Sequence, residues 1–73
     1  MTQVHFYNHE SVHVDGYRNI VSFNDNEIVL RCKKNNLIIF GSKLQIVSFN
    51  GMEITIRGYI EGVRWNYEGE KEV

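Results

Sequence analysis

The sequence contains no proline, a single cysteine and no excess of charge of either sign. Because no proline-rich or Ser/Gly-rich stretch marks a linker, residues 1–67 are predicted to form one domain, followed by an acidic, frayed tail over residues 68–73. The lone Cys32 excludes an internal disulfide and favours a reducing compartment. Nine acidic against eight basic residues give a net charge of −1, so no nucleic-acid partner is expected.

Long hydrophobic runs are also absent. The longest apolar stretch, Leu37 to Phe40, is too short to cross a bilayer, and direct membrane insertion is not expected. The opening residues, MTQVHFYNHE, contain no apolar segment of signal-peptide length, so we expect the protein to be made and kept inside the cell. A chain of this size buries about 60% of the surface that its unfolded form exposes. Self-association would offset the small core, and a homo-oligomer is expected.

What the sequence does contain is a repeat. The segment IVSFNDNEIVLR at residues 20–31 returns as IVSFNGMEITIR at residues 46–57, and eight of the twelve positions are identical. In each copy two stretches with a period of two flank an Asn-containing turn, which is the pattern of a β-hairpin. The sequence therefore predicts an all-β fold, an antiparallel meander of about eight short strands with a duplicated β-hairpin, forming a small roll, sandwich or barrel.

Turns between the predicted strands are marked by residues that accept a positive φ or cap a turn, and Asn50-Gly51 is the strongest such signal. The eight strands are placed near residues 4–7, 12–14, 20–23, 27–32, 37–40, 44–49, 53–60 and 63–67.

A second pattern, apolar-x-apolar-x-Gly, occurs as VHVDG, LIIFG and ITIRG and ends at Gly16, Gly41 and Gly58. Glycine at these places would let a strand turn a corner so that the sheet coils over its apolar face, although a glycine can also simply end a strand. Residues 37–40 are apolar on both faces, which predicts either a central strand of a two-layer structure or a subunit interface.

His5, His9 and His13 stand four residues apart, a spacing that would align three imidazoles on a helix as metal ligands. In a strand-turn-strand segment they converge only if the hairpin register brings them together. Solvent-facing strand histidines are the simpler interpretation, so neither a metal nor a cofactor is predicted. A His-based metal-binding protein is kept as an alternative.

No nucleophile or acid/base signature accompanies the reactive residue types, and an enzyme is not expected. Cys32 follows the apolar alternation of its strand and is predicted to be buried. Glu27 and Glu53 occupy equivalent positions in the two copies, each four residues before an arginine. They are interpreted as members of surface cross-strand charge pairs.

Aromatic residues interleave with arginines along the chain, which would suit a small β-barrel that binds single-stranded nucleic acid or another ligand. The chain lacks the excess of basic residues that nucleic-acid binding of this kind requires. Most of the aromatics, Phe23 and Phe49 among them, are therefore interpreted as core or cross-strand packing. Five residues are predicted at a protein interface: Tyr17, Ile38, Phe40, Tyr59 and Trp65.

A set of strand and turn residues stands in a specific order and spacing between Val4 and Tyr67. Its members are Asn8, Val12, Val14, Gly16, Val21, Ser22, Phe23, Leu30, Leu37, Ile39, Gly41, Leu44, Ile46, Ile56, Gly58 and Ile60. In this pattern the chain resembles the YabP/YqfC family of small sporulation proteins, and most closely its YabP branch.

The resemblance implies a non-enzymatic role in endospore formation in a Gram-positive bacterium, with expression in the mother cell. It also implies a membrane partner similar to YabQ or YqfD, and hence a location in the mother-cell cytoplasm and peripherally at the forespore surface. We therefore expect a sporulation protein that acts in spore cortex or coat assembly. The protein would act by associating with itself and by docking on a membrane or coat partner, through an edge strand and an aromatic patch.

Overall fold

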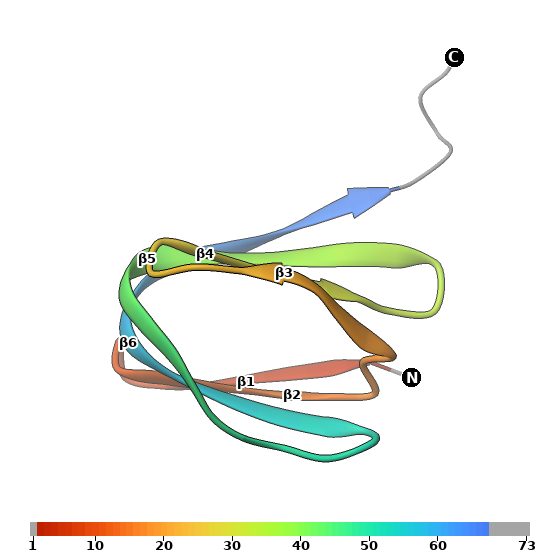
Figure 1. Cartoon of the computed structure of the whole chain (residues 1–73), viewed down its shortest axis with the longest axis horizontal. Helices are drawn as coiled ribbons and strands as arrows, with labels where there is room; N and C mark the ends of the chain where they lie inside the picture. Colours follow the sequence, from red (N-terminus) through yellow and green to blue (C-terminus); the bar gives the residue numbers. More distant parts are fainter. Residues whose placement is uncertain (1, 68–73) are drawn as a thin grey trace.

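A computed structural model describes residues 2–67 and confirms the all-β prediction. Six strands form one antiparallel sheet (Figure 1), and no helix able to span a bilayer occurs in these residues. The strands are β1 (Gln3–Tyr7), β2 (Ser11–Asp15), β3 (Asn19–Phe23), β4 (Glu27–Arg31), β5 (Asn35–Phe49) and β6 (Glu53–Tyr67). The tail predicted over residues 68–73 lies outside the described residues.

The strand order in the sheet is β1-β2-β6-β5-β4-β3. Strands β3 to β6 follow one another as a meander, whereas β2 pairs with β6 and not with β3. Both β5 and β6 are long and bent, so the sheet folds over on itself into two facing layers (Figure 1). One layer holds β3, β4, the first half of β5 and the second half of β6. The other holds β1, β2 and the remaining halves, which makes the fold an open roll.

The strand number is six and not eight, because two predicted breaks do not exist. β5 continues through residues 41–42, and β6 continues through residues 61–62. The two strands bend there instead of ending, and their mutual register shifts after Phe40 and again after Ser42. The hydrogen-bonded ladder continues on both sides of a bulge or bend. The sequence pattern cannot distinguish such a bend from a turn that ends the strand.

Glycine is required at the bend because β5 and β6 cross closely. A Cβ at Gly41 would overlap the carbonyl oxygen of Tyr59, and a Cβ at Gly58, whose φ is +138°, would overlap the carbonyl oxygen of Lys43. Gly16, with a φ of +92°, begins the link from β2 to β3. The apolar-x-apolar-x-Gly pattern therefore marks corners of the sheet.

The core lies between the two layers and consists of alternate residues along the strands, because successive side chains of a strand point to opposite faces. No polar or charged residue of the described chain is buried, so apolar packing joins the layers. Cys32 is buried, as predicted. The core residues are Val12, Val14, Tyr17, Ile28, Leu30, Cys32, Leu37, Ile39, Leu44, Ile54, Ile56 and Ile60.

The repeat is longer in the structure than the hairpin seen in the sequence. Residues 12–31 and residues 37–57 each form a strand, a glycine corner and a hairpin. The first strand of each copy pairs with the last strand of the other copy, as β2 with the first half of β6 and the first half of β5 with β4. The roll is therefore built from two copies that exchange strands, and it has an approximate internal twofold symmetry.

Backbone hydrogen bonds repeat in the same arrangement. The amide of Gly16 donates to the carbonyl of Met52 at 2.7 Å, and the amide of Gly41 donates to the carbonyl of Asn26 at 3.0 Å. In both cases the glycine that begins a corner is bonded to the hairpin turn of the other copy of the repeat. Two equivalent contacts thus close the two ends of the roll.

The two hairpin turns are capped by equivalent asparagines. Oδ1 of Asn24 accepts hydrogen bonds from the amides two and three residues ahead, at 2.8 and 2.9 Å, and Oδ1 of Asn50 accepts the same two bonds at 2.9 Å each. Such Asx turns satisfy amides that the reversal of the chain leaves outside the ladder. This is the local reason that the repeated Ile-Val-Ser-Phe-Asn sequence ends each time in a reversal.

Candidate assembly interface

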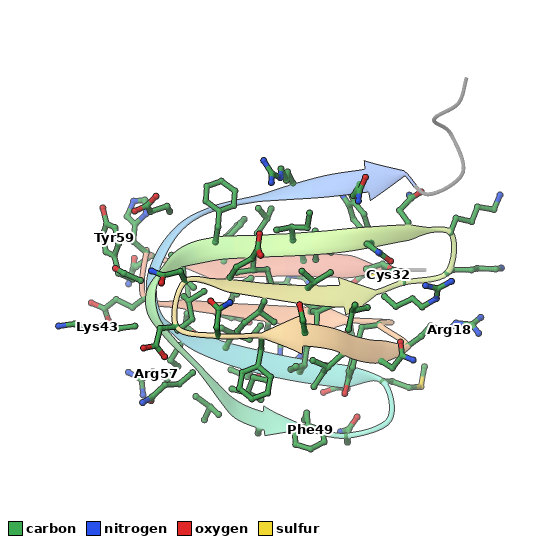
Figure 2. The ribbon with its side chains drawn as sticks, turned by 45° about the horizontal axis from the view of Figure 1, so that its top comes forward. Arg18, Cys32, Lys43, Phe49, Arg57 and Tyr59 are labelled. Atoms are coloured by element: carbon green, nitrogen blue, oxygen red, sulfur yellow. The ribbon has the colours of Figure 1, made fainter. Side chains whose placement is uncertain are left out.

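Two strand edges lie on the same side of the roll. β3 is the outermost strand of one layer, and residues 44–49 of β5 are the outermost segment of the other layer. Figures 1 and 2 show both on the near face of the molecule. Each is paired on one side, with β4 or with β6, and has no strand of the described chain on its other side, where the amide of Leu44 donates a 2.9 Å hydrogen bond to the carbonyl of Asp25. We refer to residues 19–23 and 44–49 as the paired edges.

The paired edges share the sequence Ile-Val-Ser-Phe and contain no charged residue. Soluble proteins commonly protect an exposed sheet edge with charged side chains or with bulges. Here each edge carries a bulge, because the register shifts around Val21 in β3 and around Val47 in β5. Both valines are about half exposed. The edges are thus bent but remain apolar.

Each paired edge ends in an exposed phenylalanine, and Figure 2 shows Phe49 at the end of β5. Phe23 is 62% exposed and Phe49 is 64% exposed. Their register partners, Ile28 and Ile54, are core residues, so the two rings stand at the rim of the core. A core position for Phe23 and Phe49 is therefore wrong, because an edge strand has no outer neighbour to cover its side chains.

We call the four exposed side chains Val21, Phe23, Val47 and Phe49 the edge surface. Since the two edges are equivalent segments of the two exchanged copies, the edge surface presents the same two residue types twice. A surface with approximate twofold symmetry of its own matches itself in a twofold contact between two molecules, because each apolar group meets an apolar group. The geometry of this side therefore suits contact with a second copy.

The opposite side of the roll is formed by β1 and the second half of β6. Phe6 and Trp65 occupy equivalent places there. Phe6 lies opposite Val12, the first core residue of β2, and Trp65 lies opposite Leu37, the first core residue of β5. Both rings are partly exposed. This side also carries the exposed charges of Glu61 and Arg64. It is therefore a mixed surface, unlike the uncharged paired edges.

Tyr17 is in the core and not on the surface, which corrects its place among the predicted interface residues. Its ring is only 6% exposed, and its hydroxyl donates a 2.7 Å hydrogen bond to the carbonyl oxygen of Asn50. The residue holds the link between β2 and β3 against the second hairpin turn. From the sequence, an aromatic residue next to a glycine in a loop can belong either to the core or to a surface contact. Only the folded chain shows that Tyr17 belongs to the core.

The other four predicted interface residues lie on outward-facing or edge positions. Ile38 and Phe40 are half-buried on the outer face of β5. A Cβ at Gly62 would come within 3.1 Å of the Phe40 ring, and the guanidinium carbon of Arg64 lies 5.8 Å from the ring centroid. The ring is thus partly covered from within the chain, which leaves less of it for a nucleic-acid base.

Tyr59 and Trp65 are the more accessible members of the predicted set. Tyr59 is exposed at the bend of β6, at the end of the molecule where Figure 2 also labels Lys43 and Arg57, and Trp65 is 39% exposed near the end of β6. Their place in an interface stays a prediction. They lie away from the paired edges, so the two surfaces can serve different contacts.

Sequence reasoning missed the four residues of the edge surface. The available signal was that both copies keep the same Ile-Val-Ser-Phe segment without a charge in either strand. That signal has meaning only once the two strands are known to be edges, and the edge position follows from the exchange of strands between the copies.

The hairpin register brings together two of the three histidines. His5 lies opposite His13, with ring centroids 6.3 Å apart, whereas His9 lies in the turn between β1 and β2. A different group converges on the outer face of β2 and β6. The ligand atoms of His13, Asp15 and Glu53 all lie within 4.8 Å of one another.

The repeated carboxylates do not face arginines across the sheet. Glu53 lies opposite Asp15, and Glu27 lies opposite Phe40. Glu53 nevertheless has a cross-strand partner that can carry a charge, because its Oε1 lies 3.7 Å from Nε2 of His13 on β2. The strand exchange gives each glutamate a neighbour from the other copy. Burial raises the pKa of the Cys32 thiol, and a hydrogen bond with the Thr2 side chain opposes this shift.

The chain matches the family model described as the YabP family over residues 1–72. The matched region includes all six strands and both paired edges. No curated protein matches the chain.

Proposed function

The chain belongs to the YabP family and is thus a sporulation-related protein, and from this premise we propose that it is a non-enzymatic assembly unit of the spore cortex or coat. It associates with a second copy of itself through the edge surface and docks on a membrane or coat partner through a separate contact. The observation that carries the first part is the pair of uncharged, apolar sheet edges on one side of the roll.

The energetics favour a contact of this kind. Complete burial of a phenylalanine or valine side chain contributes about 1.5–3 kcal/mol, and four such residues stand on the edge surface. The molecule has extents of 35 × 23 × 19 Å, and Figure 1 views the face that contains the paired edges along the shortest of them. These extents bound the whole face, so an interface of the roughly 800 Å² that each partner buries in a standard protein complex would engage most of it.

Backbone pairing adds to this contact. The outer side of each paired edge offers amide and carbonyl groups in strand geometry, and a twofold-related copy offers the same groups in return. The bulges at Val21 and Val47 restrict such pairing to a short stretch. We therefore propose a discrete dimer, and not a fibre, as the basic unit.

The membrane or coat partner is the second element of the proposal. A partner similar to YabQ or YqfD would hold the protein at the forespore surface from the mother-cell side. Tyr59 and Trp65 support a contact of this kind, because partly exposed Tyr and Trp side chains often carry the binding energy of protein interfaces. Co-purification with the membrane partner from a shared host, compared with Trp65→Ala and Tyr59→Ala, tests this contact separately from self-association.

Light scattering across a range of protein concentrations tests the self-association. We expect a dimer that the double substitution Phe23→Lys with Phe49→Lys converts to a monomer, because each molecule would then bury two unpaired charges in the contact. Phe6→Lys on the opposite side is the matched control and should leave the mass unchanged. Circular dichroism of each variant establishes that the strands are retained.

Two results would contradict the proposed contact. A monomer at every concentration of the unmodified protein would exclude self-association as its mode of assembly. A dimer that survives the double substitution but dissociates with Phe40→Lys would move the interface to the outer face of β5, where the sequence prediction placed it.

A further inference from the structure

A cluster of possible metal ligands on the outer face of the sheet is not used by the proposed assembly contacts. His13 and Asp15 lie two residues apart on β2 and therefore point to the same face, and Glu53 begins the neighbouring strand β6. We propose that His13, Asp15 and Glu53 form a binding site for a divalent transition metal ion of the zinc type. Their ligand atoms lie within 4.8 Å of one another. A rotamer adjustment of the exposed Glu53 side chain would bring them to the separation of about 3.4 Å that tetrahedral zinc ligands have.

The register of the sheet places two negative charges directly side by side. Asp15 pairs with Glu53. Hydrogen-bonded and non-hydrogen-bonded pairs alternate along an antiparallel ladder. The amide of Gly16 donates to the carbonyl of Met52 in the next pair, so the Asp15–Glu53 pair is of the non-hydrogen-bonded type. Opposing side chains come closest in pairs of this type. Like charges in this position destabilise a sheet. A bound cation would convert this repulsion into attraction.

His13 is oriented as a metal-binding histidine would be. Its Nδ1 lies 3.0 Å from the hydroxyl oxygen of Thr55, and its Nε2 lies 3.7 Å from Oε1 of Glu53. When Nδ1–H donates to the hydroxyl, the lone pair of Nε2 faces the carboxylate. Metal-bound histidines commonly donate their second ring nitrogen to a carboxylate, a backbone carbonyl or a water, which fixes the tautomer and the ring. The Thr55 hydroxyl would take that place here. Nε2 and the two carboxylates then form a set of acceptors that a cation between them would satisfy.

The chemistry of the donors favours one class of ion. Imidazole nitrogen together with carboxylate oxygen suits zinc and related transition metals, whereas magnesium and calcium prefer oxygen ligands alone. His5, which faces His13 at 6.3 Å between ring centroids, is placed near enough to provide a fourth ligand after a change of rotamer. The side chain of His13 is 24% exposed and that of Glu53 is 52% exposed, so an ion can reach the site from solvent.

The second copy of the repeat lacks these ligands and provides a control. At the positions equivalent to His13 and Asp15 it has Ile38 and Phe40, while Glu27 is equivalent to Glu53 and pairs with Phe40 as Glu53 pairs with Asp15. The same local backbone therefore exists once with the three ligands and once with a single carboxylate. Replacing Glu27 changes the net charge in the same way as replacing Glu53, without touching the proposed site.

Isothermal titration with zinc, together with the visible absorption spectrum of added cobalt(II), tests the site on the full chain. We expect one ion per chain in the unmodified protein. Asp15→Asn and Glu53→Gln should each weaken zinc binding by at least about tenfold, and Glu27→Gln should leave it unchanged. Thermal unfolding should shift upward with zinc in the unmodified protein and in Glu27→Gln, because a ligand of the folded state stabilises that state.

Several results would overturn the assignment. Absence of both a binding signal and a thermal shift with zinc in the unmodified protein would exclude the site. Zinc binding that Asp15→Asn leaves intact but His9→Gln removes would assign the ion to the three histidines of the first hairpin. A stoichiometry of one ion for two chains would mean that the ion bridges two molecules and that these three residues do not form a complete site.

Discussion

The hydroxyl of Tyr17 donates a 2.7 Å hydrogen bond to the carbonyl oxygen of Asn50, across 33 positions of the chain. The bond joins the link between β2 and β3 to the turn between β5 and β6, which belong to different copies of the repeat. Beside it, the amide of Gly16 donates to the carbonyl of Met52. One end of the roll is thus closed by contacts between residues that are distant in the sequence.

Tyr17→Phe should destabilise the protein by about 1 kcal/mol, because the ring packing is kept and one partly buried hydrogen bond is lost. Urea unfolding followed by circular dichroism measures the change. Tyr59→Phe is the matched control: that side chain is 58% exposed and should be neutral. Equal effects of the two substitutions would show that the Tyr17 hydroxyl does not contribute to the closure of the roll.

Gly41→Ala should lower the free energy of unfolding by about 1–3 kcal/mol or more, the range for inserting extra atoms into a packed site. The new Cβ would overlap the carbonyl oxygen of Tyr59 where β5 and β6 lie close together. Gly51→Ala has open space around its Cβ and should be nearly neutral. The midpoint of thermal unfolding compares the two variants. If Gly41→Ala were as stable as Gly51→Ala, the close crossing of the strands would be refuted.

The two capping asparagines should contribute equally to stability. Asn24→Ala and Asn50→Ala each remove a side-chain oxygen that accepts two backbone amides, and each should cost about 1 kcal/mol. Because the turns lie in different layers, the double substitution should give the sum of the two effects. Asn66→Ala, an exposed strand residue, is the control. A strongly unequal pair of effects would contradict the equivalence of the two hairpins.

The Cys32 thiol should react slowly with iodoacetamide in the folded protein. Burial raises its pKa above the usual value of 9.0, so the thiolate that attacks the reagent is scarce at neutral pH. The rate should rise sharply when the protein is unfolded in urea. A folded-state rate equal to that of a free thiol would show that the side chain is accessible.

The same shift of the Cys32 pKa predicts how stability depends on pH. Above 9.0 the unfolded chain loses the thiol proton while the folded chain keeps it, so the unfolded state binds fewer protons and the free energy of unfolding falls as pH rises. Below that value both states hold the proton and this group has no effect. Urea unfolding of the unmodified protein and of Cys32→Ala on either side of this pH isolates the contribution of Cys32.

The sequence was sufficient for the strands themselves and for most of the turns. The period of two in residues such as Ile28 and Leu30 is a local property, because each strand residue points to the face opposite its neighbours. Asn24 and Asn50 cap their turns through bonds that reach two or three residues ahead. Interactions of such short range are contained in the segment that makes them, so they can be read from its residues.

The pairing of the strands could not be read in this way. Nothing local to β2 indicates that its neighbour is β6, or that the breaks expected near Gly41 and Gly62 are bends within continuous strands. The same limitation explains the misplacement of Tyr17, Phe23 and Phe49. Whether a ring is covered depends on which strand lies beside it, and that is decided by contacts across the whole chain.

The sequence by itself determined an all-β chain, its duplicated hairpin and its membership of the YabP family. The tertiary structure decided that the two copies exchange strands. From this exchange follow the apolar edges at Phe23 and Phe49, and the meeting of Asp15 with Glu53 beside His13. The physical reason is that a hydrogen-bonded ladder accepts any strand in suitable register, and the burial of one shared apolar core selects the arrangement.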